Sequence, residues 1–143
     1  MIMQIKENKI EEIIARDGVY VSTTVGTSMR PMLRDRRDTV VITPVSGRLK
    51  KYDVALYRSG EKYFLHRVVK VLPDSYVFCG DNRTVLEKGI RDDDVIGRLS
   101  EVWRGEKKLD LDGFGYKFYS KAWVATHWLR RIAARIRRVF HRG

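Results

Sequence analysis

The chain of 143 residues has one cysteine, three prolines and three histidines. Because Cys79 is alone, no intramolecular disulfide can form, and the scattered histidines show none of the spacings typical of a zinc module. The small number of prolines, together with 43% hydrophobic residues, excludes collagen-like and low-complexity chains. These absences leave a folded protein, and the length is sufficient for one domain with its own core.

Acidic residues are missing from the last 28 positions. Residues 1–115 hold all 18 Asp and Glu and 21 of the 29 Lys and Arg, a net charge of +3, whereas residues 116–143 hold eight basic residues. The formal charge of +11 therefore belongs mostly to the C-terminus. We divide the chain into an N-terminal helix at 1–18, a domain at 19–115 and a basic tail at 116–143.

The N-terminal stretch lacks the uninterrupted apolar run that a signal peptide or membrane anchor requires. Charged residues separate its apolar side chains, and Ile10, Ile13 and Ile14 have helical spacing. We predict a short amphipathic helix over Gln4 to Arg16, ended by Asp17-Gly18. The missing leader and the free thiol favour the cytoplasm, with peripheral contact at the inner face of the membrane.

Most of the remaining chain has the pattern of β-strands. Extended runs separated by turn residues occur at 19–25, 39–43, 52–58, 62–72, 75–79, 95–103 and 107–111. Ser59-Gly60-Glu61 and Gly105 have the composition of hairpin connections. Several short strands with regular turns predict a mainly β fold, a small antiparallel β-barrel or sandwich, rather than a parallel α/β sheet.

The tail has the period of a helix. At about 100° per residue, one arc collects the apolar side chains Ala125, Trp128, Leu129, Ile132, Ala133, Ile136, Val139 and Phe140, and the arginines fall opposite. We predict a basic amphipathic helix, too interrupted by charge to cross a bilayer. Docking on the protein's own β core is one interpretation. Binding of an anionic membrane surface through residues 117–142 fits the pattern better. Nucleic acid is not an expected partner, because no aromatic residues interleave with the arginines.

A candidate nucleophile lies in the segment Gly26-Thr27-Ser28, which Met29-Arg30-Pro31 follows. A serine on such a tight turn can direct its Oγ and its own N–H toward a substrate carbonyl, although ordinary turns have the same composition. Serine is a weak nucleophile until a base takes its proton. His66 is the best candidate base, since an imidazole with an unperturbed pKa of about 6.5 accepts a proton near neutral pH.

Strand alternation places His66 on one face with Phe64 and Val68, so a core histidine with a satisfied hydrogen bond is the alternative interpretation. The other histidines, His127 and His141, lie in the basic tail. Gly80-Asp81-Asn82-Arg83 follows an apolar strand as an ordinary turn would. The nearby carboxylates of Asp81 and Glu87 could equally orient an imidazole as the third member of a triad.

Taken in order, five segments resemble the conserved boxes of type I signal peptidases. They are Gly26-Thr27-Ser28-Met29-Arg30-Pro31-Met32-Leu33, Tyr52-Asp53-Val54, His66-Arg67-Val68-Val69, Gly80-Asp81-Asn82-Arg83 and Asp94-Val95-Ile96-Gly97-Arg98. The resemblance covers about residues 19–103, and the self-cleaving repressors of the SOS response share the Ser-Met start and the mostly β fold. It implies a catalytic domain of the signal-peptidase type, with no cofactor and no metal.

By this resemblance Ser28 is the nucleophile and His66 the general base, as in the archaeal and endoplasmic-reticulum branch, where histidine replaces the bacterial lysine. Lys70 is the nearest lysine, but its position does not match the lysine motif. In the histidine branch an Asp follows the Gly-Asp-Asn box by six residues, and here Glu87 stands at that position, a carboxylate on a longer side chain. Asp81 and then Asp53 are the other candidates. Since Gly26 offers no hydroxyl to an oxyanion hole, the Ser28 N–H would supply the donor.

We therefore expect a serine endopeptidase that cleaves a precursor or leader peptide through an acyl-enzyme. The resemblance implies that the substrate binds as an extended strand beside the sheet, with small residues before the cut. Because the family's N-terminal anchor is missing here, the tail or another protein provides membrane contact, or the substrate is soluble. The alternative is a non-catalytic or regulatory relative that binds a leader peptide or partner protein and is tethered by the C-terminal helix.

Overall fold

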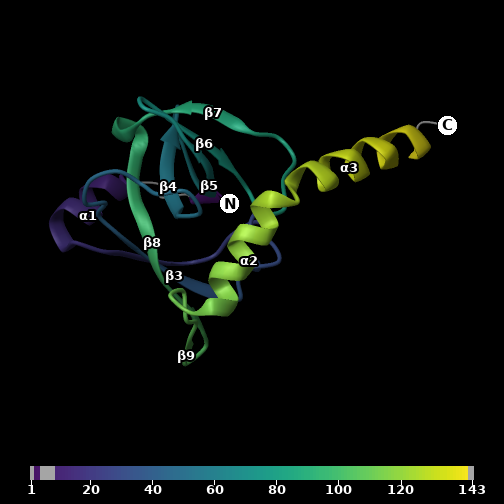
Figure 1. Ribbon diagram of the computed structural model, residues 1–143. Helices are drawn as coiled ribbons and strands as arrows, with labels where there is room; N and C mark the ends of the chain where they lie inside the picture. Colours follow the sequence, from purple (N-terminus) through teal and green to yellow (C-terminus); the bar gives the residue numbers. More distant parts are fainter. Residues whose placement is uncertain (1, 4–8, 142–143) are drawn as a thin grey trace.

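The computed structural model describes residues 2–3 and 9–141, with side chains from 9 to 141 (Figure 1). The described elements, in chain order, are β1 (Ile2–Met3), α1 (Ile10–Asp17), β2 (Tyr20–Thr23), β3 (Asp38–Thr43), β4 (Val54–Ser59), β5 (Lys62–Val71), β6 (Tyr76–Cys79), β7 (Glu87–Ile90), the 3-10 turn η1 (Asp92–Asp94), β8 (Val95–Arg104), β9 (Lys107–Lys108), α2 (Phe114–Ala125) and α3 (His127–His141).

These strands form one antiparallel sheet in the order β2-β3-β8-β4-β5-β6-β7, with β1 paired to β5 and β9 to β8. Register shifts interrupt the ladders at Val41/Ile42, Leu56/Tyr57, Val68/Lys70 and Tyr76/Phe78. Such irregularities bend a strand and increase its twist. The sheet accordingly curls into a half-barrel (Figure 1), and the prediction of a mainly antiparallel β fold is confirmed.

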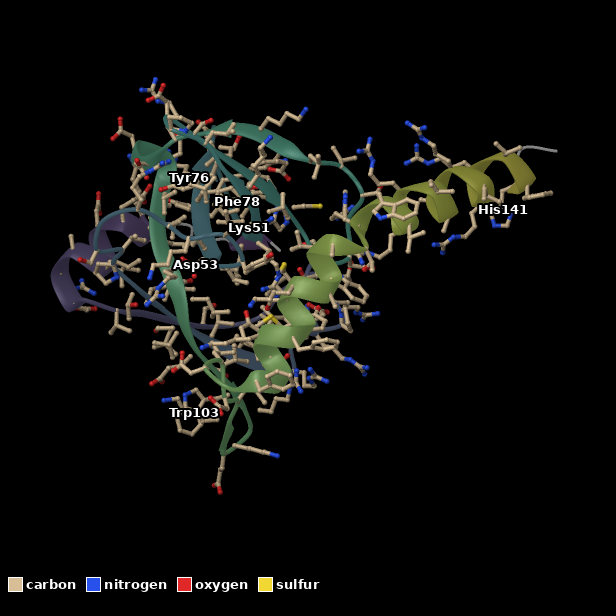
Figure 2. All side chains as sticks on the ribbon, in the orientation of Figure 1. Lys51, Asp53, Tyr76, Phe78, Trp103 and His141 are labelled. Carbon is tan, nitrogen blue, oxygen red and sulfur yellow. The ribbon has the colours of Figure 1, made fainter. Side chains whose placement is uncertain are left out.

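The central strand β4 is buried on both faces of the sheet. Val54 and Leu56 belong to a core cluster that also receives α1 and the segment after β2. The alternate residues Ala55 and Tyr57 belong to a second cluster inside the curl, together with aromatic side chains of β6. Figure 2 shows two of these, Tyr76 and Phe78, within the curl. The period of two along β4 thus divides the core into two layers.

Two glycines in the left-handed region end elements at the positions that the sequence indicated. Gly18, at φ 72°, caps α1 and donates its N–H to Ile14 O. Gly60, at φ 63°, lies in the connection between β4 and β5, where Ser59 pairs with Lys62. The hairpin loop is therefore the two residues Gly60-Glu61, which fixes the register of β4 against β5.

Three elements differ from the sequence-based expectation. Residues 4–8 of the expected N-terminal helix lie outside the described residues, and α1 begins at Ile10. The short strands β1 and β7 were not predicted. The strand expected at 107–111 is reduced to β9, because its ladder with β8 contains only the pairs Trp103 with Lys108 and Arg104 with Lys107.

The tail contains two helices in place of the single one expected. α2 begins at Phe114, before the expected boundary at 116, and Thr126 separates it from α3, with its Oγ1 donating to Ala122 O at 2.7 Å. Figure 1 shows α2 alongside the sheet and α3 extending away from it. No helix among residues 9–141 is both long enough and apolar enough to cross a bilayer.

Candidate active site

The segment between β2 and β3 holds Ser28 on a turn that is tied to the core. Met29 and Leu33 are fully buried, and Leu33 N–H donates to Met29 O at 2.9 Å, which closes one helical turn directly after the serine. Before the serine, Gly26 adopts φ 101° and donates its N–H to Asp35 Oδ1 at 2.8 Å. The positive φ favours glycine at this position, and the two anchors leave Ser28 at a fixed bend.

The Gly80-Asp81-Asn82 turn after β6 clamps the serine from the other side. Asn82 N–H donates to Ser28 O at 2.8 Å, and its side-chain amide donates to Thr27 O at 3.1 Å. A Cβ atom on Gly80 would lie 2.6 Å from Ser28 O and 3.2 Å from His66 Cδ2. Glycine at position 80 permits this close approach, because a Cβ there would force the serine backbone or the turn to shift.

His66 lies on β5 with both ring nitrogens engaged. Its Nε2 is 3.2 Å from Ser28 Oγ, and its Nδ1 is 3.1 Å from Tyr57 OH and 3.4 Å from Glu87 Oε1. Phe64 and Tyr57 pack their rings near the imidazole. Burial lowers the pKa of His66, although the hydrogen bond to Glu87 opposes this shift. The imidazole is consequently neutral at neutral pH, which leaves Nε2 able to accept the Ser28 proton when Nδ1 carries the hydrogen.

Glu87 opens β7, where it pairs with Phe78 of β6. The hydrogen bond from His66 lowers the pKa of this carboxyl, and a second hydrogen bond from Tyr57 acts in the same direction. Burial, with the hydrogen bond to Glu87 second, raises the pKa of the Tyr57 phenol, which keeps its proton and donates it to Glu87 Oε2. The phenol oxygen and the carboxylate together face His66 Nδ1, so both favour the tautomer with hydrogen on Nδ1.

Asp81, the second candidate acid, is engaged on the opposite face of β5. Arg67 donates Nε to Asp81 Oδ1 at 2.8 Å and Nη2 to Oδ2 at 2.9 Å, and both side chains are buried. Tyr119 OH of α2 donates to the same carboxylate at 2.7 Å, while Arg67 Nη1 donates to Ser120 Oγ at 2.9 Å. This network joins α2 to the sheet, and the geometry gives Asp81 a structural partner in Arg67.

The remaining candidates lie apart from the Ser28 and His66 pair. Asp53 accepts the Lys50 N–H at 2.8 Å and so caps the turn that precedes β4. The Lys70 side chain is exposed near the end of β5. His127 Nε2 is 3.5 Å from Cys79 Sγ, and Figure 2 shows His141 at the far end of α3.

Tyr57 was missed by the sequence analysis, yet its position could have been derived. Once the hairpin loop is taken as Gly60-Glu61, Tyr57 pairs with Phe64, whose side chain shares a face with His66. Side chains diagonal to each other on one face lie within reach when they are aromatic. The register of this hairpin therefore places a phenol beside the imidazole.

Among residues 9–141, no three His, Cys, Asp or Glu side chains gather in a way that could hold a metal ion. Neither family models nor curated proteins give a match to this chain.

Proposed function

We propose that this protein is a serine endopeptidase of the signal-peptidase type, with the corresponding catalytic fold, acting on a precursor or leader peptide. The observation that carries the proposal is the hydrogen-bonded series Ser28 Oγ, His66 Nε2, His66 Nδ1 and Glu87. A nucleophile, a base and an orienting acid in this relationship form the arrangement that activates a serine. The chain order of the five segments that resemble signal peptidase boxes supports the same reaction.

In the proposed reaction Ser28 Oγ attacks the scissile carbonyl carbon while its proton moves to His66 Nε2. The carbon–nitrogen bond then breaks, and His66 gives this proton to the leaving amine. A water molecule next loses a proton to Nε2 and attacks the acyl carbon, which releases the new carboxyl end and restores the serine. Glu87 remains ionised and stabilises the imidazolium, which its lowered pKa favours.

The developing oxyanion requires a donor, and we assign this role to the Ser28 backbone N–H. The Asn82 and Thr27 contacts hold the serine backbone in place. In this assignment Gly80 contributes by allowing that close approach. Pre-organised backbone donors act without a side-chain hydroxyl, so glycine at position 26 is compatible with the reaction.

The direct test is covalent labelling by a fluorophosphonate probe combined with cleavage of a peptide library. We expect labelling of the wild-type chain, no labelling of Ser28→Ala and a strong loss in His66→Ala. Ser59→Ala, at the exposed end of β4, is the matched control and should label like wild type. Circular dichroism establishes that each variant is folded.

Labelling of a folded Ser28→Ala variant at the wild-type level would refute the assignment of the nucleophile. A folded wild-type chain that neither reacts with the probe nor cleaves any library peptide would also overturn the proposal. Such a chain that still bound peptides would instead be the non-catalytic peptide-binding relative.

A further inference from the structure

α3 carries its large apolar side chains on the outside of the molecule. Trp128, Leu129, Ile132, Ile136, Val139 and Phe140 are all exposed, with exposed fractions between 47% and 77%. Exposed apolar residues scattered singly are normal, but six on one helix of 15 residues form a continuous face about 22 Å long. A continuous exposed apolar face is typical of a surface that binds a partner.

α2 provides a contrast within the same tail. Its Ser120 is buried, Tyr119 and Trp123 donate to Asp81, and Tyr116 packs against the core. The polar anchors of α2 are thus satisfied by the β domain. Docking on the core, the alternative interpretation of the tail, therefore applies to α2, while the apolar face of α3 remains uncovered.

The orientation of α3 is fixed at its first turn. His127 lies beside Cys79, and Arg130 stacks on Trp123 at 4.0 Å and donates to Trp123 O at 2.6 Å. Farther along, Arg131, Arg135 and Arg138 face the segment Thr84–Leu86 across a cavity of about 350 Å³. The cationic side of the helix therefore faces the body, and the apolar side faces away from it.

The charge of α3 is uniformly positive. No acidic residue follows Asp112, and α3 contains five arginines. At 100° per residue Arg135 borders the apolar face beside Trp128, and Arg137 borders its other edge near Ala133. Long cationic side chains at the borders of an apolar face can extend to lipid head groups while the apolar residues enter the acyl boundary.

We propose that α3 is an interfacial helix that binds the surface of an anionic lipid membrane. Nucleic acid would pair with the arginines but leave the apolar face in water. Binding in an acidic protein groove would not require that acidic residues be absent all around the helix. An anionic bilayer is the partner that covers the apolar face and also pairs with the arginines at its borders. This inference does not depend on the peptidase reaction.

The test uses the full chain and vesicles of phosphatidylcholine, alone or mixed with phosphatidylglycerol. We expect flotation with the mixed vesicles, weaker flotation with phosphatidylcholine, and a blue shift of tryptophan emission that Trp128→Phe removes. Ile132→Gln/Ile136→Gln should lower the partition coefficient at least tenfold. Val71→Gln, an exposed apolar residue at the end of β5, is the matched control and should float like wild type.

The charge contribution is tested separately. Arg135→Gln/Arg137→Gln, at the two borders of the apolar face, should weaken binding by about fivefold per cation, whereas the same two changes to Lys should preserve it. Ser28→Ala should float like wild type, which distinguishes this proposal from the peptidase proposal. Equal flotation of Ile132→Gln/Ile136→Gln and wild type would overturn it. Binding to a DNA duplex without binding to mixed vesicles would overturn it as well.

Discussion

His66 and Arg67 are neighbours on β5, yet they belong to two different regions of the molecule. His66 faces the inside of the curl, where Glu87 and Tyr57 contact its Nδ1. Arg67 faces α2 and forms a buried pair with Asp81. Each basic side chain thus has its own carboxylate, and the alternation of the strand keeps the two pairs on opposite faces.

The two pairs differ in whether the basic side chain has a nitrogen directed at a group that can react. The guanidinium of Arg67 is saturated, with Asp81, Ser120 and Tyr116 among its partners, and this locks α2 onto the sheet. The imidazole of His66 directs one nitrogen at a serine hydroxyl, a group that can react. We expect the saturated pair to stabilise the fold and the pair that ends on the Ser28 hydroxyl to serve the proposed reaction. Substitutions should therefore separate activity from stability.

The largest effect is expected from Glu87→Gln. Loss of the anionic partner should lower kcat by about 10³- to 10⁴-fold while the protein stays folded. Burial already lowers the pKa of His66, so the acid limb of kcat/KM in wild type should lie below pH 6.5. Because Glu87 raises the pKa of His66, its removal should move that limb to lower pH. A pH–rate profile measures both effects.

The control for Glu87→Gln is Glu101→Gln, which removes a carboxylate that accepts from Trp103 and Lys108 on the surface of β8. It should change neither the rate nor the position of the acid limb. An acid limb at the same pH in Glu87→Gln and wild type would show that Glu87 does not act on His66.

The next effect concerns the other pair and stability. Arg67→Met leaves the Asp81 carboxylate buried without its cation and should lower the free energy of unfolding by about 3 to 5 kcal/mol. Arg67→Met/Asp81→Leu removes both charges and should recover part of this loss. Urea unfolding measures both variants. The exposed pair gives the control, since Arg16→Met should cause no measurable change. A double variant less stable than Arg67→Met would contradict this interpretation.

Gly80→Ala should have an intermediate effect on activity. The new Cβ would lie 2.6 Å from Ser28 O, so the backbone of the serine has to move and its hydrogen bond from Asn82 lengthens. A displacement of about 1 Å at a reacting group costs about a hundredfold in rate. Gly115→Ala on α2, where a Cβ meets nothing within 4 Å, is the control. Full activity in Gly80→Ala would show that this approach is not critical.

The smallest effect is expected from Tyr57→Phe. Its hydroxyl touches His66 and Glu87 but not the reacting atoms, so it is a positioning residue, and its loss should lower kcat about tenfold with KM unchanged. Tyr63→Phe removes a similar phenol that donates to Glu11 on the other face of β5, and it should leave kcat unchanged. Steady-state kinetics distinguish the two variants, and an equal loss in both would point to a general packing effect.

Much of the fold could be predicted because turn residues separate the extended runs that form β2 to β6 and β8. β7 could not, since Glu87, Lys88 and Gly89 are poor strand formers, and only pairing with β6 extends them. The break at Thr126 was also hidden, because apolar residues continue through it. The break follows the part of α2 that Arg67 holds against the sheet through Ser120, a contact that joins residues far apart in sequence.

For the candidate site the sequence proposed Ser28 and His66, whose side chains lie 3.2 Å apart, and the order of preference among the acids came only from the resemblance. The choice between Glu87 and Asp81 depends on which face of the sheet each carboxylate reaches, and the turn after β6 determines this. Tyr57 was missed because an aromatic residue within a strand usually indicates packing. The register of one hairpin contained the missing information.

The strand order has a consequence for the motions of the site. β4 lies between β8 and β5 and is buried on both faces, whereas β7 ends the sheet and is held by a ladder with β6 that contains a register shift. Backbone amides at a sheet edge exchange with deuterium through small local openings, while those in a central strand exchange only when the whole domain opens. Glu87 therefore lies on a strand at one end of the sheet, where we expect exchange through local openings. In the proposed site such an opening would separate the Glu87 carboxylate from His66 and restore the contact without unfolding β4.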